Sequence, residues 1–178
     1  MLVYLTLIDD EADRTKFEEV YERYRDRMLH TAYGILRDRA AAEDVTHQAF
    51  LKIIENLEKI SDPACHKTRS FVVIIAEHLA INEYHRRRRH PAEELEEWTA
   101  IEAGVTPERK VGGKEAVGRV IAGLPPRERE VILLKYHVGY QTGEIAALLG
   151  MSEDAVRKAV SRGKKRLAEL LREEGIEV

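Results

Sequence analysis

The stretch TGEIAALLGMSEDAVRKAVSRGKKRL, residues 142–167, decides the fold that we expect for the C-terminal part of this 178-residue chain. Thr142 can cap a short helix, Gly150 can adopt the left-handed conformation that ends it, and Ser152 can cap the helix that follows. Two helices joined by so tight a turn form a helix-turn-helix, whose second helix enters the major groove of DNA. We therefore predict this motif within residues 141–171.

The second helix of the motif has one apolar and one polar face. At 100° per residue, one side gathers Val156, Ala159, Val160, Gly163 and Leu167. The opposite side and its flanks carry the side chains that we predict to contact DNA, which are Asp154, Arg157, Lys158, Ser161, Arg162 and Lys165.

Charge is distributed unevenly along the chain. Between residues 151 and 172, seven Lys or Arg residues stand against three acids, whereas the net charge of the whole chain is −3. A local positive excess suits contacts to DNA phosphates together with reading of base edges. Basic residues also solvate ordinary helix surfaces, so charge alone leaves both interpretations open. The coincidence of the turn residues, the small residues and the basic face favours DNA binding.

The N-terminal half shows three helical patterns and no convincing strand alternation. Apolar residues recur at three- and four-residue steps in residues 15–36 and again in residues 41–57. Polar residues and a proline indicate a loop over residues 60–67, and a third helix is predicted from about residue 68 to residue 89, before Pro91. Three tyrosines of the first pattern lie at helical spacing and are predicted to be core side chains, namely Tyr21, Tyr24 and Tyr33.

The segment from Pro91 to Gly113 differs in composition from both of its neighbours. It is rich in glutamate, glycine and proline, which is typical of a linker. Four further helical patterns follow it, separated by glycines and by a pair of prolines. The sequence therefore predicts an all-α chain of two small helical domains, residues 1–90 and 114–178, joined by a flexible linker, residues 91–113.

The composition favours a globular cytoplasmic protein. Hydrophobic residues make up 44% of the chain and charged residues 34%, which is enough apolar material for packed cores. Cys65 is the single cysteine and cannot form an internal disulfide, so nothing indicates an oxidising compartment. The longest internal apolar run, residues 71–76, is too short to cross a bilayer, and we expect no membrane insertion.

The sequence offers no candidate catalytic residues and no cofactor site. Cys65 with His66, and His85 with His90, lack the paired spacing of a zinc site, so no metal is expected. The glycines before Lys114 lack the upstream glycine and the following Ser or Thr of a phosphate-binding loop. Carboxylates on amphipathic helices are normally solvated. We therefore predict a protein that is not an enzyme.

Several motifs resemble the sigma-70 family of transcription initiation factors, in particular its extracytoplasmic-function group. The stretches LPPREREV at residues 124–131, GEIA at 143–146 and LGMS at 149–152 are similar to region 4 of that family. AEDVTHQAFLK at residues 42–52 resembles the region 2 helix that docks on the clamp of the polymerase's largest subunit. Residues 69–89 resemble the helix that engages the minus-10 promoter element.

The resemblance implies an alternative sigma factor, whose partners are the RNA polymerase core, through the largest-subunit clamp and the beta subunit, and promoter DNA. It also implies an anti-sigma factor as a candidate partner. The implied core-binding residues are Asp44, His47, Gln48 and Leu51. The implied minus-10 contacts are Lys67, Arg69, His78, Asn82, Arg86, Arg87, Arg88 and Arg89, and the DNA-contacting side chains of residues 154–165 would read the minus-35 element.

The residues themselves agree with these roles but leave alternatives. An acidic and amide-bearing helix face suits a basic or polar protein partner, although an ordinary solvated face has the same pattern. The four arginines of residues 86–89 can neutralise phosphates, or can pair with the glutamates of residues 93–97. Glu77 stands where the family commonly has a basic residue, and a carboxylate facing phosphates would oppose DNA binding.

Three other functions remain open at this point. A repressor or activator would use the N-terminal helices for sensing or dimerisation and would bind palindromic duplex DNA without polymerase. A degenerate relative would dock on polymerase without opening DNA, and Glu77 is the feature that favours it. A helical enzyme would need acid and base groups placed in one pocket, and the sequence indicates none.

Overall fold

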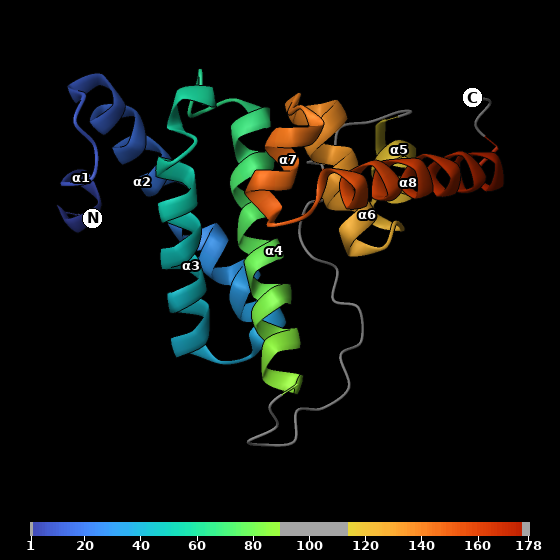
Figure 1. Ribbon diagram of the computed structural model, residues 1–178, viewed down its shortest axis with the longest axis horizontal. Helices are drawn as coiled ribbons and strands as arrows, with labels where there is room; N and C mark the ends of the chain where they lie inside the picture. The colour runs from blue at the N-terminus through green and yellow to red at the C-terminus, as the bar shows by residue number, and fades with distance from the viewer. Residues whose placement is uncertain (1, 90–113, 176–178) are drawn as a thin grey trace. The chain divides into compact units, whose positions relative to one another are not determined.

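The structure, a computed structural model, describes residues 2–89 and 114–175 (Figure 1). The chain divides into two compact units, residues 1–103 and 104–178. Every regular element in the described ranges is helical, which confirms the prediction of an all-α chain with two helical domains. The predicted linker, residues 91–113, lies outside the described residues.

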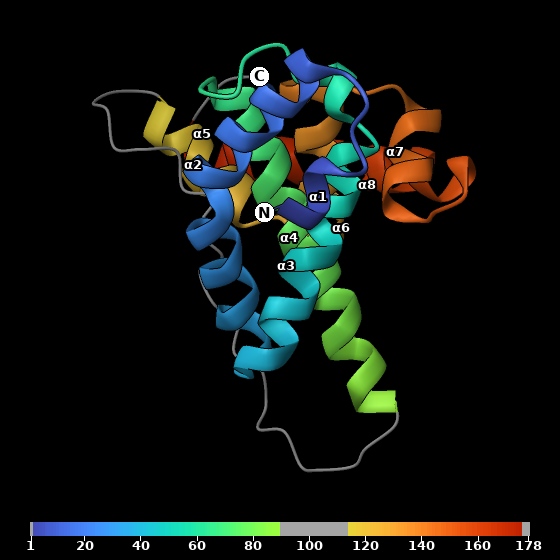
Figure 2. The same ribbon diagram turned by 90° about the vertical axis from the view of Figure 1, so that its left-hand side faces the viewer.

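Unit 1 is built on three long helices that pack on one another, α2, α3 and α4 (Figures 1 and 2). Its elements are α1 (Leu2–Leu5), α2 (Glu11–Leu36), α3 (Arg39–Ile54), the short 3-10 helix η1 (Leu57–Lys59) and α4 (His66–Arg89). The three predicted helices are confirmed, with ends that differ by a few residues. The sequence did not predict α1, because four residues are too short to show a helical period.

Aspartate caps explain where two of these helices begin. The Asp10 side chain accepts a hydrogen bond from the Asp13 backbone N–H (3.0 Å), so α2 starts one turn earlier than its apolar pattern. The Asp38 side chain caps α3 in the same way, by accepting from the Ala41 backbone N–H (3.2 Å). Both caps satisfy backbone donors that the first turn of a helix leaves without a partner.

The middle of α4 forms the centre of unit 1. Every side chain from Phe71 to His78 is buried, because α4 contacts α2 on one flank and α3 on another. Tyr24 of α2 is also buried and donates a hydrogen bond to the Pro63 carbonyl oxygen (2.7 Å), which fixes the segment before α4. Tyr33 is 44% exposed, so its prediction as a core side chain is wrong: it lies on the solvent side near the end of α2.

Unit 2 packs its shorter helices against one long helix, α8. Its elements are α5 (Lys114–Ala122), α6 (Pro126–Ile132), the π-helical turn η2 (Leu133–Val138), α7 (Thr142–Leu149) and α8 (Glu153–Glu173). Val131, Leu134, Ile145 and Val156 are fully buried and form the centre of this unit. The four helical patterns predicted after residue 113 are all present.

The predicted helix-turn-helix is formed by α7 and α8, with one correction to its capping. Gly150 ends α7 with φ of 61°, and Ser152 Oγ accepts from the Ala155 backbone N–H (3.2 Å), as predicted. The cap of α7 is Gln141 and not Thr142: the Gln141 backbone N–H donates to Glu144 Oε2 (2.7 Å). The hydroxyl of Thr142 instead lies 3.2 Å from the Lys135 ammonium, a contact from outside the motif.

Gly163 sets how closely α8 approaches α6. It is buried, and a Cβ at this position would lie 2.8 Å from Cγ1 of Ile132 and 3.2 Å from its Cδ1. The separation of 2.8 Å is shorter than packed carbon atoms adopt, and 3.2 Å is tighter than most such contacts. The absence of a side chain at Gly163 therefore holds the two helices at their observed separation.

We expect Gly163→Ala to lower the free energy of unfolding by about 1–3 kcal/mol, because overpacking outweighs the better helix propensity of alanine. Gly34→Ala in α2 is the matched control, since nothing lies within 4 Å of its added Cβ. That variant should be as stable as the parent chain or slightly more so. Urea unfolding followed by circular dichroism measures both, and an equally stable Gly163→Ala variant would contradict the packing described.

Candidate nucleic-acid and protein interfaces

The outer face of α8 presents the six side chains that the sequence predicted for DNA contact. Asp154, Arg157, Lys158, Ser161, Arg162 and Lys165 are all exposed. Val156, Ala159 and Gly163 are buried on the opposite side, which confirms the predicted division of the helix into two faces. Contact of this face with DNA stays a prediction.

Two ion pairs on the outer face of α8 are local and solvent-exposed. Arg157 pairs with Glu153 (3.1 Å) and Lys158 with Asp154 (2.7 Å), each one turn away along the helix. Exposed pairs of this kind contribute about 0–1 kcal/mol, so phosphate groups can replace the carboxylates at low cost. The local pairs therefore orient Arg157 and Lys158 while leaving both free to exchange partners.

Two contacts beside this face were not predicted from the sequence. The Arg162 guanidinium lies 3.6 Å from Glu128 of α6, whose side chain is mostly buried. The Lys164 ammonium lies 5.0 Å from the ring centroid of Tyr136, which is 54% exposed. Both contacts join residues far apart in the chain, and no local pattern marks them. The carboxylate of Glu128 and the ring of Tyr136 therefore lie at the border of the basic face.

Of the predicted minus-10 residues, those with exposed side chains lie toward the two ends of α4, and His78 lies in its buried middle. Lys67 is exposed and Arg69 partly buried near its start, and Asn82 is exposed toward its end. His78 is 4% exposed, and its Nε2 lies 2.8 Å from Nδ2 of Asn82. The structure therefore contradicts the prediction that His78 contacts DNA, since its ring is enclosed by the packing of α4. Asn82 keeps an accessible side chain.

Glu77 does not face solvent. It is 2% exposed within the buried run of α4, so the expectation that its carboxylate would oppose phosphates is wrong. A helical wheel of α4 has apolar residues on nearly every side in this stretch. The pattern therefore does not indicate which side of the helix faces solvent. Glu77 therefore no longer favours a degenerate relative that docks on polymerase without opening DNA.

The arginine run at the end of α4 is held by partners inside unit 1. Arg86 makes two hydrogen bonds of 2.7 Å to Glu83, and Arg87 joins Glu83 (2.8 Å) to Asp38 (2.8 Å) at the start of α3. Arg88 lies over the ring of Tyr84, 5.8 Å from its centroid. The predicted pairing with the glutamates of residues 93–97, and the side chain of Arg89, lie outside the described residues.

These contacts shift two carboxyl pKa values. The hydrogen bond from Arg87, followed by that from the Ala41 backbone, lowers the pKa of Asp38. Hydrogen bonding from Arg86 is the largest cause that lowers the pKa of Glu83, and burial partly opposes it. Asp38 thus caps α3 and binds Arg87 at the same time. The network ties the end of α4 to the junction of α2 and α3.

The exposed face of α3 carries the predicted protein-binding residues. Asp44, His47 and Gln48 are exposed and Leu51 is partly buried, one turn apart along the helix. The structure adds a partner that the sequence did not indicate: the Tyr4 hydroxyl lies 2.6 Å from Nδ1 of His47. The contact spans 43 residues, so no local spacing pointed to it.

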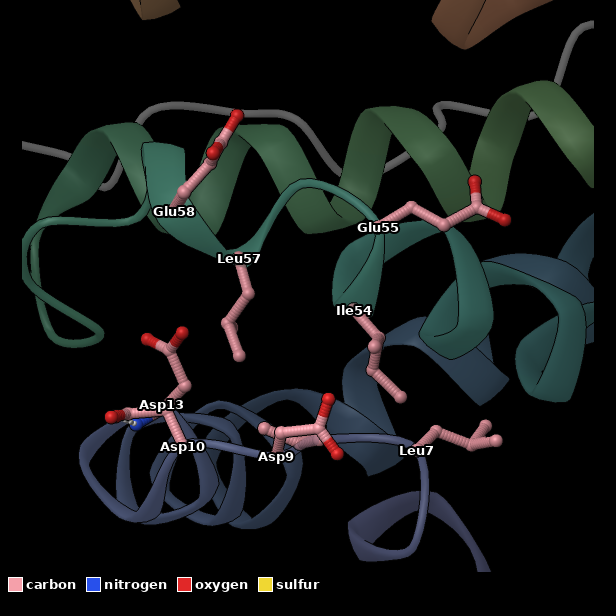
Figure 3. A pocket seen from close by; sticks show the side chains of 9 residues that line it. Leu7, Asp9, Asp10, Asp13, Ile54, Glu55, Leu57 and Glu58 are labelled. Atoms are coloured by element: carbon pink, nitrogen blue, oxygen red, sulfur yellow. Dashed lines mark hydrogen bonds between the residues drawn. The ribbon is translucent and has the colours of Figure 1, made fainter.

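An open groove of about 330 Å³ lies beyond the end of α3 (Figure 3). Ile54 and Leu57 point into it from one side, opposite the segment that joins α1 to α2. The carboxylates of Glu55 and Glu58 point outward at its border. The full lining is Leu7, Ile8, Asp9, Asp10, Asp13, Ile54, Glu55, Leu57 and Glu58. The groove is thus lined by apolar and acidic side chains together.

Two families match the two units. Residues 20–90 match Sigma-70 region 2, and residues 114–167 match Sigma-70, region 4. The first family covers α2, α3 and α4, and the second covers α5 to most of α8.

Curated relatives match across both units. The chain is 31% identical over 165 residues to the ECF RNA polymerase sigma factor SigD of Mycobacterium tuberculosis, covering 87% of this chain and 76% of that protein. It is 27% identical over 177 residues to the ECF sigma factor SigW of Bacillus subtilis, covering 92% of each. It is 31% identical over 138 residues to the probable sigma factor RfaY of Xanthomonas campestris, covering 75% of this chain but only 34% of that protein.

One solved structure of similar chain length is the sigma factor RpoE of Bartonella quintana in complex with the anti-sigma factor NepR. It is 19% identical, with 88% of this chain and 96% of that chain covered and a TM-score of 0.43. A TM-score this low supports no statement about the partners of the present chain. Within residues 2–89 and 114–175, no helix combines the length and apolar character that crossing a bilayer requires.

We expect acid to weaken unit 1 through Asp38 and Glu83. Folding lowers the pKa of both carboxyls, so their contribution to stability is present above about pH 5 and is lost as pH falls through their folded pKa values. Arg87→Ala removes one shared partner and should flatten the decline in stability between about pH 5 and pH 3. Urea unfolding at a series of pH values measures this, and parallel profiles for variant and parent would refute it.

The basic face of α8 predicts a salt-dependent affinity for duplex DNA. In Arg162→Ala/Lys165→Ala, we expect weaker binding and a slope of log K against log salt that is smaller by about 0.9 for each lost phosphate contact. Arg172→Ala removes a charge from the last turn of the same helix and serves as the control. Fluorescence anisotropy of labelled duplex measures both, and equal effects of the two substitutions would exclude a specific role for this face.

Proposed function

Because the chain belongs to the extracytoplasmic-function group of the sigma-70 family of RNA polymerase sigma factors, we propose that it is an alternative sigma factor that binds the polymerase core and directs promoter-specific initiation. The observation that carries this proposal is the pairing of regions 2 and 4 with two separately packed helical units. A chain built this way can engage two promoter elements at once.

In unit 1, α3 binds the polymerase and α4 meets the minus-10 element. The exposed face with Asp44, His47 and Gln48 offers acceptors and a carboxylate to a basic or polar helix of the largest-subunit clamp. Lys67 at the start of α4 and Asn82 toward its end remain accessible to phosphates and to bases of an opened strand. His78 takes no part in this contact, because it is buried.

The arginines at the end of α4 divide into two roles. Arg87 is partly buried between Asp38 and Glu83 and positions the helix end. Arg86 and Arg88 are exposed and carry charge toward the backbone of the minus-10 region. Arg69, which is partly buried, completes the set near the helix start.

In unit 2, α8 reads the minus-35 element from the major groove. Arg162 and Arg157 carry the planar donors that pair with guanine, while Ser161 can donate to or accept from several bases. Lys158 and Lys165 supply phosphate contacts that fix the register of the helix on the duplex. Unit 2 also contributes the contact with the beta subunit of the polymerase.

The polymerase performs the bond chemistry, so the proposed protein is an initiation factor that works where RNA is made, in the cytoplasm. Residues 1–90 form the core-binding and minus-10 domain, and residues 114–178 form the minus-35 domain. An anti-sigma factor stays a predicted partner, because no feature of the described residues identifies it.

Run-off transcription tests the proposal directly. Purified core polymerase is supplied with a library of promoters that vary in both elements, with and without the full chain. We expect transcripts from a defined subset of promoters only when the chain is present. Tight duplex binding by a dimer without polymerase would instead identify a repressor or activator, and core binding without any transcript would identify a degenerate relative. Either result overturns the proposal.

A further inference from the structure

We propose that the N-terminal segment, residues 3–9, extends the polymerase-docking face of α3, and that a part of the polymerase core with apolar and basic side chains packs against it. This inference rests on the proposed function, since it names a second part of the same docking surface. None of these residues belongs to the portion that matches region 2, which begins at residue 20.

Tyr4 anchors the segment to unit 1. It is buried, and its ring centroid lies 5.5 Å from that of Phe17, 5.6 Å from that of Phe50 and 5.1 Å from that of His47. A four-residue helix is not stable by itself, so these ring contacts keep α1 in place. The tyrosine thereby connects the N-terminal segment to α3 at a residue of its docking face.

The same tyrosine orients His47. Its hydroxyl lies 2.6 Å from Nδ1, so one ring nitrogen is engaged inside the protein. His47 is nevertheless exposed, and Nε2 is the ring nitrogen left to meet a partner. Tyr4 therefore acts as a positioning residue for the docking face.

The segment presents apolar side chains to solvent. Val3 is 71% exposed and Leu7 is 56% exposed, and they are the large aliphatic side chains that stand out as exposed within the described residues. Single exposed apolar residues are common on protein surfaces. These two lie on either side of Tyr4, and Leu7 also lines the groove opposite Ile54. Their arrangement favours a contact surface over chance exposure.

The groove continues the docking face of α3. Gln48, Leu51 and Glu55 follow one another at steps of three and four residues, so they form a single stripe that ends at the groove. The groove in turn joins this stripe to Leu7 and Asp9 of the N-terminal segment (Figure 3). One partner surface can therefore cover both parts.

Charge identifies the chemistry of the occupant. Asp9, Asp10, Glu55 and Glu58 are exposed around the groove, whereas Asp13 is paired with Lys16 (2.7 Å). Acidic groups beside the apolar side chains of the groove repel nucleic-acid phosphates and attract Lys or Arg side chains that stand next to apolar ones. The partner is thus a protein, and continuity with the α3 stripe assigns it to the polymerase core.

The test compares full-length variants for binding to core polymerase. Val3→Glu/Leu7→Glu adds like charge to the acidic surface and should weaken binding by at least about tenfold. Tyr33→Glu changes another exposed hydrophobic side chain of unit 1, at the far end of α2, and should bind as the parent does. Competition against a labelled parent chain gives the affinities, and circular dichroism confirms that both variants are folded.

Tyr4→Phe keeps the ring contacts and removes only the hydroxyl next to His47. We expect core binding weakened about three- to tenfold with helical content unchanged. If Val3→Glu/Leu7→Glu binds core polymerase as tightly as the parent chain does, the inference is overturned. The same holds if this variant keeps its core binding and loses only the binding of an anti-sigma factor. Failure of the parent chain itself to bind core overturns the proposed function, which separates the two outcomes.

Discussion

The burial of α4 between α2 and α3 is the interaction on which the surfaces of unit 1 depend. Because every side chain from Phe71 to His78 is enclosed, this stretch of the helix contributes packing and no outward contacts. Polar and basic groups are left at the two ends of α4, with Lys67 in its first turn and the arginines in its last. The exposed face of α3 stays free for a different partner. Packing thus separates the face proposed to bind protein from the helix ends proposed to face DNA.

In unit 2, the close approach of two helices likewise decides which side chains face solvent. With no side chain at Gly163, α8 can lie against Ile132 of α6. The apolar side of α8 is then buried in the core of unit 2. The basic residues are then forced to the outside as a set. The exposed pairs of Arg157 with Glu153 and of Lys158 with Asp154 are weak, so DNA phosphates can compete for these two cations. Packing in the core orients α8, and the basic face of this helix remains available for binding.

Much of the fold could be predicted from the sequence, because helical periodicity, the Ser152 cap and Gly150 are local signals. The two faces of α8 followed from the same logic. The burial of Glu77 and His78 was missed, because the apolar stretch around them has no side that is recognisably outward. Gln141 and not Thr142 caps α7, and the Thr142 hydroxyl lies 3.2 Å from the Lys135 ammonium. The contact of Tyr4 with His47 joins positions too distant for any spacing rule. Binding roles of the exposed residues came from resemblance, and the structure shows only that most are accessible.

We propose that the two helical units contact two separate segments of one promoter while the polymerase core is bound. Site-specific photocrosslinking measures this most directly, with a crosslinker placed at position 67 in one preparation and at position 165 in another, both exposed in the structure. With core polymerase and a responsive promoter, position 165 should label the upstream duplex element and position 67 the element nearer the start site. Labelling of one shared segment from both positions, or equal labelling without the polymerase, would contradict the account.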